Sequence, residues 1–239
     1  MSSYDALAAS YDALMTDAAY LKRAEYLDRC LKRDKTPVET VLDLGCGTGT
    51  ISCLLAQMGY RVLAADASVE MLTEAMFKAS SMEEPPMFLH QSMEKLRLGR
   101  EVDAVISTID AINYLTREKA LRETFKRVHK CLRPGGQFIF DINSPAKFRA
   151  MDGRMYTDET EESYCVWRTF FSERTKICTY QVDLFRLRRD GAGARDYEEH
   201  RERAWSVEEL TEFLADAGFK TVKITGDMKQ ANRRKMSSG

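Results

Sequence analysis

Three glycines at alternate positions mark the segment with the clearest chemical potential. The segment Val41 to Thr50 has the pattern of a buried strand, a turn containing Gly45, Gly47 and Gly49, and the first residue of a helix. Such a turn needs glycine because glycine adopts positive φ angles and lets a ligand lie against bare backbone. Free N–H groups of the following helix point toward that ligand. The turn therefore predicts a nucleoside site at the carboxyl end of a parallel sheet.

Two carboxylates near the turn indicate which nucleoside it takes. Asp43 lies on the strand two residues before Gly45, and Asp66 ends the next apolar run. The glycines follow G-x-G-x-G and not the G-x-G-x-x-G of dinucleotide sites. A carboxylate at Asp43 would repel a pyrophosphate but attract an ammonium or sulfonium group. The pattern favours a zwitterionic nucleoside without phosphates.

Three segments, in this order, resemble the motifs of one enzyme family. The segment Val41 to Thr50 resembles the first motif of the class I S-adenosylmethionine-dependent methyltransferases, and Ala65 to Leu72 resembles their second. Leu132 to Gly136, followed by the run to Asp141, resembles the turn into their fifth strand. The resemblance covers residues 41 to 142 well. It implies S-adenosylmethionine as cofactor and transfer of its methyl group to a small-molecule acceptor, an amine or a hydroxyl, as in enzymes that methylate amines on sugars or amino acids.

The resemblance also implies a cofactor site residue by residue. The backbone of the glycine turn should run beside the methionine part, with Asp43 near its ammonium group. Asp66 should accept a hydrogen bond from each ribose hydroxyl, because the two oxygens of a carboxylate match a cis-diol. Ala67 and Met71 should pack on adenine. The expected cofactor contacts are Asp43, Gly45, Cys46, Gly47, Thr48, Gly49, Asp66, Ala67, Met71, Ser92, Met93 and Ser107.

The position facing the adenine amino group departs from the family pattern. An acid usually accepts a hydrogen bond there, whereas the segment His90-Gln91-Ser92-Met93 places Ser92 at the corresponding position. A hydroxyl accepts the same hydrogen bond without charge and with shorter reach. Gln91 is the alternative acceptor, and cofactor affinity is the property that this departure affects.

The segment Ser107 to Leu115 follows the fourth expected strand, where the family lines the transferred methyl group and the acceptor. Asp110 and Asn113 are the candidate acceptor contacts; the alternative is that they only cap the next helix. The segment lacks the N-P-P-Y sequence that accompanies methylation of exocyclic amines on bases. DNA and many RNA targets are disfavoured accordingly.

Tyr11 and His200 are the candidate catalytic residues. Tyr11-Asp12 repeats Tyr4-Asp5 and resembles the Tyr-Asp pair near the N-terminus of small-molecule methyltransferases, where this segment covers the cofactor. A spacing of seven residues also fits a simple amphipathic cap. Methyl transfer mainly requires nucleophile, methyl carbon and sulfur in line within a dry cavity. If the acceptor must lose a proton, His200 is the histidine best placed to act as base.

Alternating strands and helices predict a doubly wound α/β fold with a mostly parallel, Rossmann-like sheet. The expected strands are 41–44, 61–65, 87–90, 102–107 and 137–142, and the expected helices are 17–33, 50–58, 68–79 and 117–131. Aromatic and β-branched residues then predict antiparallel strands at 163–172, 176–188 and 194–204. These strands form an antiparallel β insertion before the last helix, 206–217, and would act as a lid.

Four parts follow from this pattern: an N-terminal helical cap (1–35), the cofactor-binding core (36–142), the antiparallel lid for the acceptor (143–204), and a C-terminal helix, strand and tail (205–239). The segment 221–225 is the expected sixth strand of the core. The tail after it lacks an apolar run for the antiparallel seventh strand usual in the family.

Composition narrows the possible partners and location. The 239 residues contain 36 Lys plus Arg and 37 Asp plus Glu. The protein therefore has no overall positive electrostatic potential that would attract nucleic acid. No apolar stretch approaches the ~20 residues that cross a bilayer, and no signal-peptide pattern begins the chain, so a cytoplasmic protein is expected, not associated with a membrane. Six cysteines show no C-x-x-C pair and no histidines at metal spacing, which predicts neither metal nor disulfide.

Three alternatives stay open. The enzyme could act on tRNA or protein, although the chain has no basic domain. A cofactor-binding protein without turnover would carry the same motifs. The lid could also form the seam of a homodimer.

Overall fold

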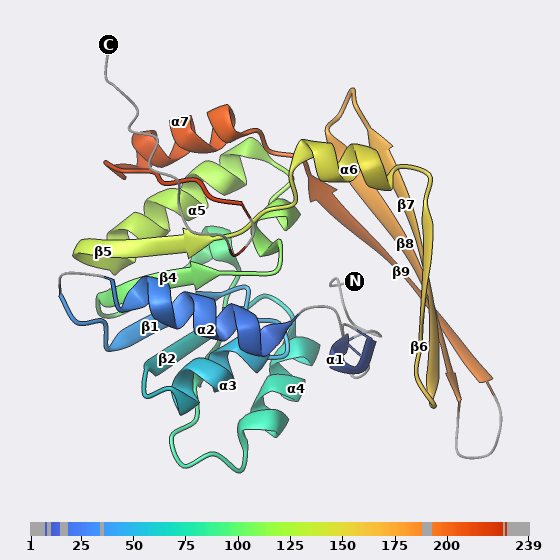
Figure 1. Ribbon diagram of the computed structural model, residues 1–239, viewed down its shortest axis with the longest axis horizontal. Helices are drawn as coiled ribbons and strands as arrows, with labels where there is room; N and C mark the ends of the chain where they lie inside the picture. The colour runs from blue at the N-terminus through green and yellow to red at the C-terminus, as the bar shows by residue number, and fades with distance from the viewer. Residues whose placement is uncertain are drawn as a thin grey trace.

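The structure is a computed structural model that describes Ala8, residues 11–14, 19–33, 36–187 and 193–226, and Met228. Two sheets stand side by side in it, one parallel with five strands and one antiparallel with four (Figure 1). This arrangement confirms the predicted fold class. The first Tyr-Asp copy, the first two residues of the helix expected at 17–33, the last residue of the strand expected at 176–188 and the tail from 229 lie outside the described residues.

The parallel sheet has the strand order β3-β2-β1-β4-β5. Its strands are β1 (Thr40–Leu44), β2 (Arg61–Asp66), β3 (Met87–His90), β4 (Val102–Ser107) and β5 (Leu132–Phe140). From β1 the chain moves outward to β3, and it then returns to β4 on the other side of β1. The carboxyl ends of β1 and β4 therefore form the topological switch point, where ligands of such sheets bind.

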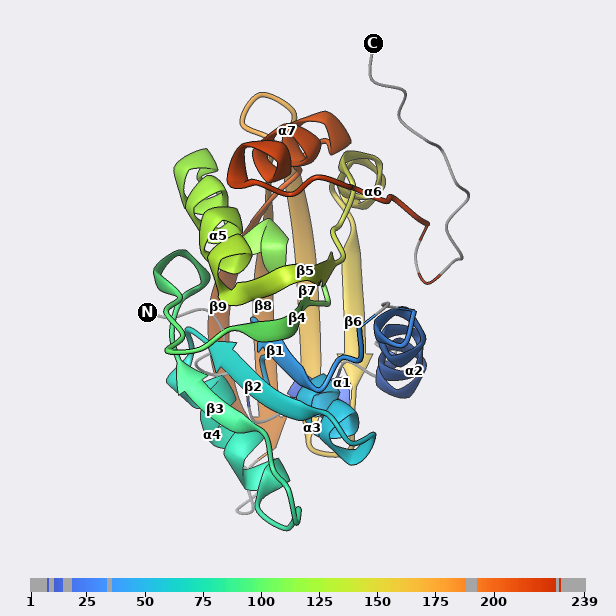
Figure 2. The same ribbon diagram turned by 90° about the vertical axis from the view of Figure 1, so that its left-hand side faces the viewer.

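Helices cover both faces of this sheet because the strands alternate their side chains. Val41 packs with residues of α2 and α3, whereas its neighbour Leu42 packs on the opposite side with Val128 of α5. Figure 2 shows α2 and α3 on one side of the sheet and α5 and α7 on the other. The helices are α2 (Tyr20–Leu31), α3 (Thr50–Gln57), α4 (Val69–Ala79), α5 (Glu118–Cys131) and α7 (Val207–Ala217), with short 3-10 helices η3 (Met93–Lys95) and η4 (Ala111–Tyr114).

The last helix begins and ends where its sequence signals predict. Ser206 accepts a hydrogen bond from the backbone N–H of Glu209, and the Glu209 side chain accepts one from the backbone N–H of Ser206. This reciprocal pair satisfies two N–H groups that the helix leaves free. Gly218 ends α7 with a φ of 106°.

The antiparallel sheet has the order β6-β7-β8-β9 and forms the predicted insertion between the parallel sheet and α7. Its strands are β6 (Met155–Glu159), β7 (Ser163–Ser172), β8 (Ile177–Leu187) and β9 (Gly193–Arg203). One face packs Cys165, Tyr180 and Val182 together with Leu14 of α1 (Tyr11–Leu14) and Phe148 of α6 (Pro145–Met151). In Figure 1 no described helix covers the other face.

Three elements differ from the sequence-based expectations. The predicted sixth strand at 221–225 is wrong, since these residues pair with no strand and Ile224 is 54% exposed. Strand β5 begins at Leu132 and not at 137, with a register irregularity opposite β4. Helix α6 and strand β6 were not predicted because both are too short to establish a periodicity. The start of α6 nevertheless has a visible signal, Ser144 as N-cap followed by Pro145.

The helical cap predicted for residues 1–35 divides in the structure. Helix α2 packs on α3 and the parallel sheet as one of the covering helices, and only α1 lies between the two sheets. None of the described helices has the length and apolar composition that crossing a bilayer requires.

Candidate functional site

The glycine turn at the carboxyl end of β1 requires glycine for two different reasons. All three glycines have positive φ angles, between 53° and 78°. A Cβ on Gly45 would lie 2.5 Å from the Met93 Cε atom and 2.9 Å from the Ala111 Cβ atom, whereas a Cβ on Gly47 would meet no atom within 4 Å. Gly45 is therefore needed for packing. Gly47 presents bare backbone to open space, as a cofactor cradle does.

Asp66, at the end of β2, fastens this turn. Its carboxylate accepts hydrogen bonds from the backbone N–H of Gly47 at 2.8 Å and of Ser68 at 2.9 Å. Each carboxylate oxygen has a further lone pair, so both remain able to accept a ribose hydroxyl. Asp66 thus positions the turn and lies next to Gly47, whose backbone borders open space.

Asp43 provides the observation that best tests the fit of a cationic ligand. The residue is 1% exposed, and the Ser52 hydroxyl donates to its Oδ2 atom at 2.6 Å. Its Oδ1 atom has no hydrogen-bond partner among the described residues. Burial raises the pKa of the Asp43 carboxyl to about 7; the Ser52 hydrogen bond opposes this shift and the Asp66 carboxylate adds to it. Because an unpaired buried oxygen costs free energy, an ammonium group beside it would be favourable.

The residues expected around adenine lie along β3 and α4. Met71 is buried, and the Ala67 carbonyl oxygen lies 3.0 Å from the Nε2 atom of His90. The Gln91 side chain holds the Arg97 backbone, accepting from its N–H at 2.8 Å and donating to its carbonyl oxygen at 3.2 Å. Gln91 is thereby occupied, and Ser92, which does not cap η3 through its side chain, remains the candidate.

The side chains of Cys46, Thr48 and Ser107 shape the turn from within. The Ser107 hydroxyl donates to the Leu44 carbonyl oxygen at 2.7 Å and so joins β4 to β1. Thr48 donates to Asp12 of α1. Burial, and then the carboxylates of Asp43 and Asp66, hold the pKa of the Cys46 thiol well above its ordinary value. The thiol stays neutral at physiological pH and is not an activated nucleophile.

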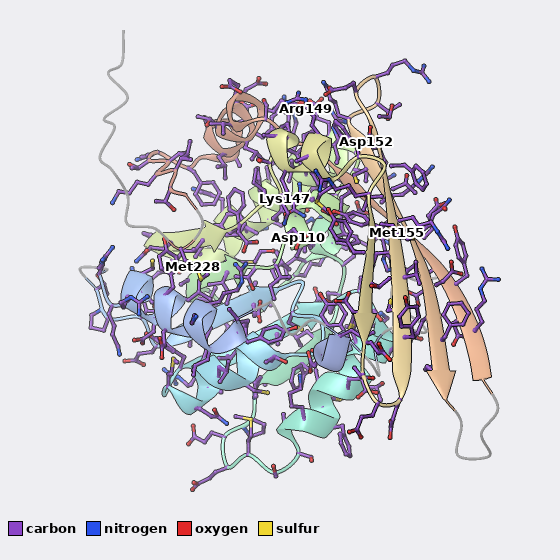
Figure 3. All side chains as sticks on the ribbon, turned by 45° about the vertical axis from the view of Figure 1, so that its right-hand side comes forward. Asp110, Lys147, Arg149, Asp152, Met155 and Met228 are labelled. Atoms are coloured by element: carbon purple, nitrogen blue, oxygen red, sulfur yellow. The ribbon has the colours of Figure 1, made fainter. Side chains whose placement is uncertain are left out.

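A group of polar side chains, in which Asn143 and Glu202 are buried, joins the loop after β4 to the antiparallel sheet. The Asn143 Nδ2 atom donates to Asp110 at 2.7 Å and to Glu202 of β9 at 3.1 Å, and the Lys147 Nζ atom donates to the Asn143 Oδ1 atom at 2.6 Å. In Figure 3 Asp110 and Lys147 lie between the two sheets. The structure thus brings Asp110 together with a lid residue that the sequence-based candidates omit.

Asp110 and Glu202 are two neighbouring carboxyl groups whose pKa values are both raised. Burial raises the pKa of the Asp110 carboxyl, which the Asp141 carboxylate also raises and Lys147 lowers. Burial and the Asp110 carboxylate raise the pKa of Glu202 well above its usual range. The Glu202 carboxyl is hydrogen-bonded to Asp110 and to Tyr180. Each carboxyl group therefore keeps its proton to a higher pH than an isolated one does, because neighbouring negative charges oppose each other's ionisation.

Asn113 has a different environment from the one expected. Its side chain is fully buried and donates to the backbone carbonyl oxygens of Asn143 at 3.1 Å and Arg203 at 2.8 Å. Its Oδ1 atom accepts from the Asn143 N–H at 2.8 Å. The amide therefore links three chain segments, and its position does not favour contact with an acceptor.

The two candidate catalytic residues both lie at the inner face of the antiparallel sheet, Tyr11 packed against it and His200 within β9. Tyr11 packs on the inner apolar cluster of that sheet, next to Leu14. His200 is 1% exposed; its Nε2 atom lies 3.0 Å from a Glu198 carboxylate oxygen, and its ring contacts Tyr114 edge-on. Neither position by itself assigns a catalytic role.

Sequence reasoning missed Glu202, although a signal was available. Strand β9 places every second residue inward, and the inward residues Asp196, Glu198, His200 and Glu202 are all polar. It also missed Asp12, which was noted only as the neighbour of Tyr11.

Comparisons with known proteins agree with this geometry. Residues 41–136 match the family model described as a methyltransferase domain. The chain is 32% identical over 226 residues to "Putative methyltransferase YqeM" of Bacillus subtilis (strain 168), an alignment that covers 94% of this chain and 89% of the relative.

Solved structures extend the similarity to the whole fold. An S-adenosylmethionine-dependent methyltransferase from Clostridium acetobutylicum superposes with a TM-score of 0.80 and 29% identity, covering 90% of this chain and 87% of that one. The sugar N-methyltransferase KedS8 from a Streptoalloteichus species has a TM-score of 0.77 at 21% identity, with coverages of 90% and 86%. At that identity the second likeness concerns the fold alone.

Proposed function

Since the chain belongs to the class I S-adenosylmethionine-dependent methyltransferases, we propose that it methylates an amine nitrogen of a small-molecule acceptor held between the glycine turn and the antiparallel sheet. The observation that carries this proposal is that Asp110 and Glu202 lie together on the Asn143 amide, between the two sheets. A carboxylate at this place suits an acceptor that arrives as an ammonium ion.

The cofactor contacts that we propose are those whose positions fit a zwitterionic nucleoside. Bound S-adenosylmethionine supplies an electrophilic methyl group on a sulfonium. The unpaired Oδ1 atom of Asp43 would hold its ammonium group, Asp66 its ribose hydroxyls, and the open backbone at Gly47 its methionine part. Met71, Ala67 and Ser92 would line adenine.

The acceptor needs a neutral nitrogen before it can take a methyl group, because an ammonium has no lone pair. A carboxylate of the Asp110 and Glu202 pair can take a proton from the ammonium, which leaves the amine free to attack. Asn143 and Lys147 keep the two carboxyls in place.

Tritium transfer from methyl-labelled S-adenosylmethionine tests the proposal. The protein is incubated with panels of small primary amines and of matched alcohols, and separately with tRNA and with a protein extract. We expect label only in the amine panel, with a rate that rises as the pH approaches the pKa of the amine. Label in alcohols, in tRNA or in protein would contradict the acceptor class. Cofactor binding without any transfer would indicate a binding protein.

Asp110→Asn sharpens this experiment, because asparagine keeps the shape but removes the proton acceptor. We expect turnover of the amine to fall at least tenfold, with cofactor affinity unchanged. Asp152→Asn on the lid, whose Oδ1 atom accepts from the Phe171 N–H away from this pair, is the matched control. Equal turnover in the two variants would remove Asp110 from catalysis.

We also propose that the outer face of the antiparallel sheet mediates a homodimer. It exposes Tyr164, Phe170, Phe185 and Tyr197 together, each at least 40% accessible. Light scattering on the wild type and on Phe170→Glu should show a dimer and a monomer, respectively. A monomeric wild type would contradict this seam.

A further inference from the structure

Helix α1 touches both halves of the molecule. Its apolar residues Tyr11 and Leu14 pack on the inner face of the antiparallel sheet, where Leu14 is 3% exposed. Asp12 is displaced around the helix from these two residues, since one residue corresponds to about 100° of rotation. Its carboxylate contacts the glycine turn of the other sheet. Figure 1 shows α1 in this bridging position.

Asp12 is the centre of a polar group at the start of α3. The Thr48 hydroxyl donates to it at 2.7 Å, and the Thr50 hydroxyl lies 3.3 Å from both of its carboxylate oxygens. The Tyr20 hydroxyl donates to it at 3.3 Å from the start of α2. Lys78 of α4 forms an ion pair with it. Four donors from three elements thus converge on one carboxylate.

Lys78 connects this group to the backbone of the turn. Its Nζ atom donates to the Thr48 carbonyl oxygen at 2.9 Å and to the Thr48 hydroxyl at 3.2 Å, and it also contacts the Thr50 hydroxyl. Lys78 and Asp12 are each about one-third exposed at the side chain. An ion pair that also holds a backbone carbonyl restrains the turn more than an isolated surface pair does.

We propose that Asp12 is a positioning residue that fastens α1 over the glycine turn and, through Leu14, couples the antiparallel sheet to the cofactor site. With the Asp12 contacts formed, α1 closes one side of the turn; with them broken, α1 is held only by its apolar face. Retention of the bound cofactor then depends on Asp12. Weaker packing of Leu14 on the antiparallel sheet would also weaken cofactor binding, because Leu14 and Asp12 lie on the same helix. This inference rests on the cofactor and is independent of the acceptor proposed above.

Calorimetry with S-adenosylhomocysteine and S-adenosylmethionine tests the positioning role. Asp12→Asn keeps the shape of the side chain and removes its charge, and Lys78→Met removes the ion-pair partner. We expect each variant to bind both ligands about tenfold more weakly, since charge-assisted hydrogen bonds are lost. The double variant should bind no more weakly than Lys78→Met alone, because both substitutions break the same contact. Asp12→Glu should recover part of the affinity.

Asp28→Asn is the matched control. Asp28 of α2 also accepts from a lysine and a tyrosine, Lys32 at 2.9 Å and Tyr60 at 2.8 Å, but away from the glycine turn. Its replacement should lower the melting temperature and leave both affinities unchanged. Affinity of Asp12→Asn within twofold of the wild type would overturn the proposal. A loss confined to S-adenosylmethionine would also overturn it, since Asp12 would then only neutralise Lys78 near a cationic ligand.

Leu14→Ala tests the coupling. We expect S-adenosylhomocysteine to bind about fivefold more weakly, while the melting temperature of the free protein changes little, because a helix of one turn can detach without unfolding the two sheets. Leu27→Ala removes an equally buried leucine from α2. It should lower the melting temperature and leave the affinity for S-adenosylhomocysteine unchanged. Unchanged affinity in Leu14→Ala would refute the coupling. Failure of the wild type to bind either ligand would instead refute the cofactor assignment.

Discussion

The parallel and antiparallel sheets differ in where their strands carry polar residues. In the parallel sheet, most buried side chains within the strands are apolar, and the polar groups of the candidate site lie at or beside the carboxyl ends of β1 and β2, at Asp43, Gly47 and Asp66. In the antiparallel sheet, polar residues such as His200 and Glu202 are buried within a strand. A site at strand ends is encoded by a few consecutive residues. A site on a sheet face depends on which face is covered, and that is a tertiary property.

The largest expected effect concerns the parallel sheet. Asp66→Ala removes the acceptor of the Gly47 and Ser68 N–H groups and of the ribose hydroxyls, so S-adenosylhomocysteine should bind at least about 100-fold more weakly by calorimetry. Asp103→Ala is the control. Asp103 likewise accepts backbone N–H groups, from Glu39 and Thr40, but at the opposite edge of the sheet. Asp103→Ala should lower the stability of the protein and leave its affinity for S-adenosylhomocysteine unchanged. Equal losses of affinity in the two variants would contradict the assignment of the cofactor site to the carboxyl ends of the strands.

Asp43 should make cofactor binding depend on pH. Its carboxyl has a pKa of about 7 in the folded protein, and only the ionised form attracts an ammonium group. We expect S-adenosylhomocysteine to bind up to tenfold more tightly at pH 8 than at pH 6, and Asp43→Asn to bind weakly with no such dependence. A wild-type affinity that does not change over this range would contradict the assignment of Asp43.

The same carboxyl should destabilise the free protein at high pH. Its pKa in the folded state is raised above the ordinary 3.8, so the folded protein binds the proton more tightly than the unfolded chain. This contribution, roughly 4 kcal/mol at most, is fully present below pH 4 and is lost as the pH rises through about 7. The melting temperature of Asp43→Asn should therefore exceed that of the wild type at pH 8.

Glu202 gives the corresponding test for the antiparallel sheet. Its pKa is also raised, so its contribution to stability is present below the ordinary glutamate pKa and is lost as the pH rises through the value in the folded state. As the pH rises above the ordinary glutamate pKa, the wild type should lose more in melting temperature than Glu202→Gln, which resembles the protonated form. Parallel curves up to about pH 9 would show that Glu202 does not titrate over this range and would contradict the prediction.

The smallest expected effect on turnover concerns His200. The residue is buried against Glu198, Tyr114 and Trp167, so His200→Ala should lower the melting temperature by leaving a cavity. Turnover should stay within about threefold of the wild type at neutral pH. A larger loss that shrinks at high pH would identify His200 as the base.

Much of the parallel sheet could be predicted from the sequence because its signals are local. The glycine turn, the strand before it and Asp66 lie between Thr40 and Asp66, and every strand of this sheet was expected near its observed place. The strand predicted at 221–225 was wrong because it rested on β-branched residues alone, and no neighbouring strand pairs with this segment. A strand propensity becomes a strand only where a sheet edge and an apolar surface receive it.

By itself, the sequence determined the cofactor class and the strand ends that form its site, since steric limits on φ and the charge of two carboxylates act over a few residues. Only the tertiary structure decided that Asp110 meets Glu202, 92 positions later in the chain, and that Asp12 reaches Thr48 and Lys78. These contacts join residues from different elements. The raised pKa values of Asp110 and Glu202 and the ion pair of Asp12 exist only after the two sheets have packed together.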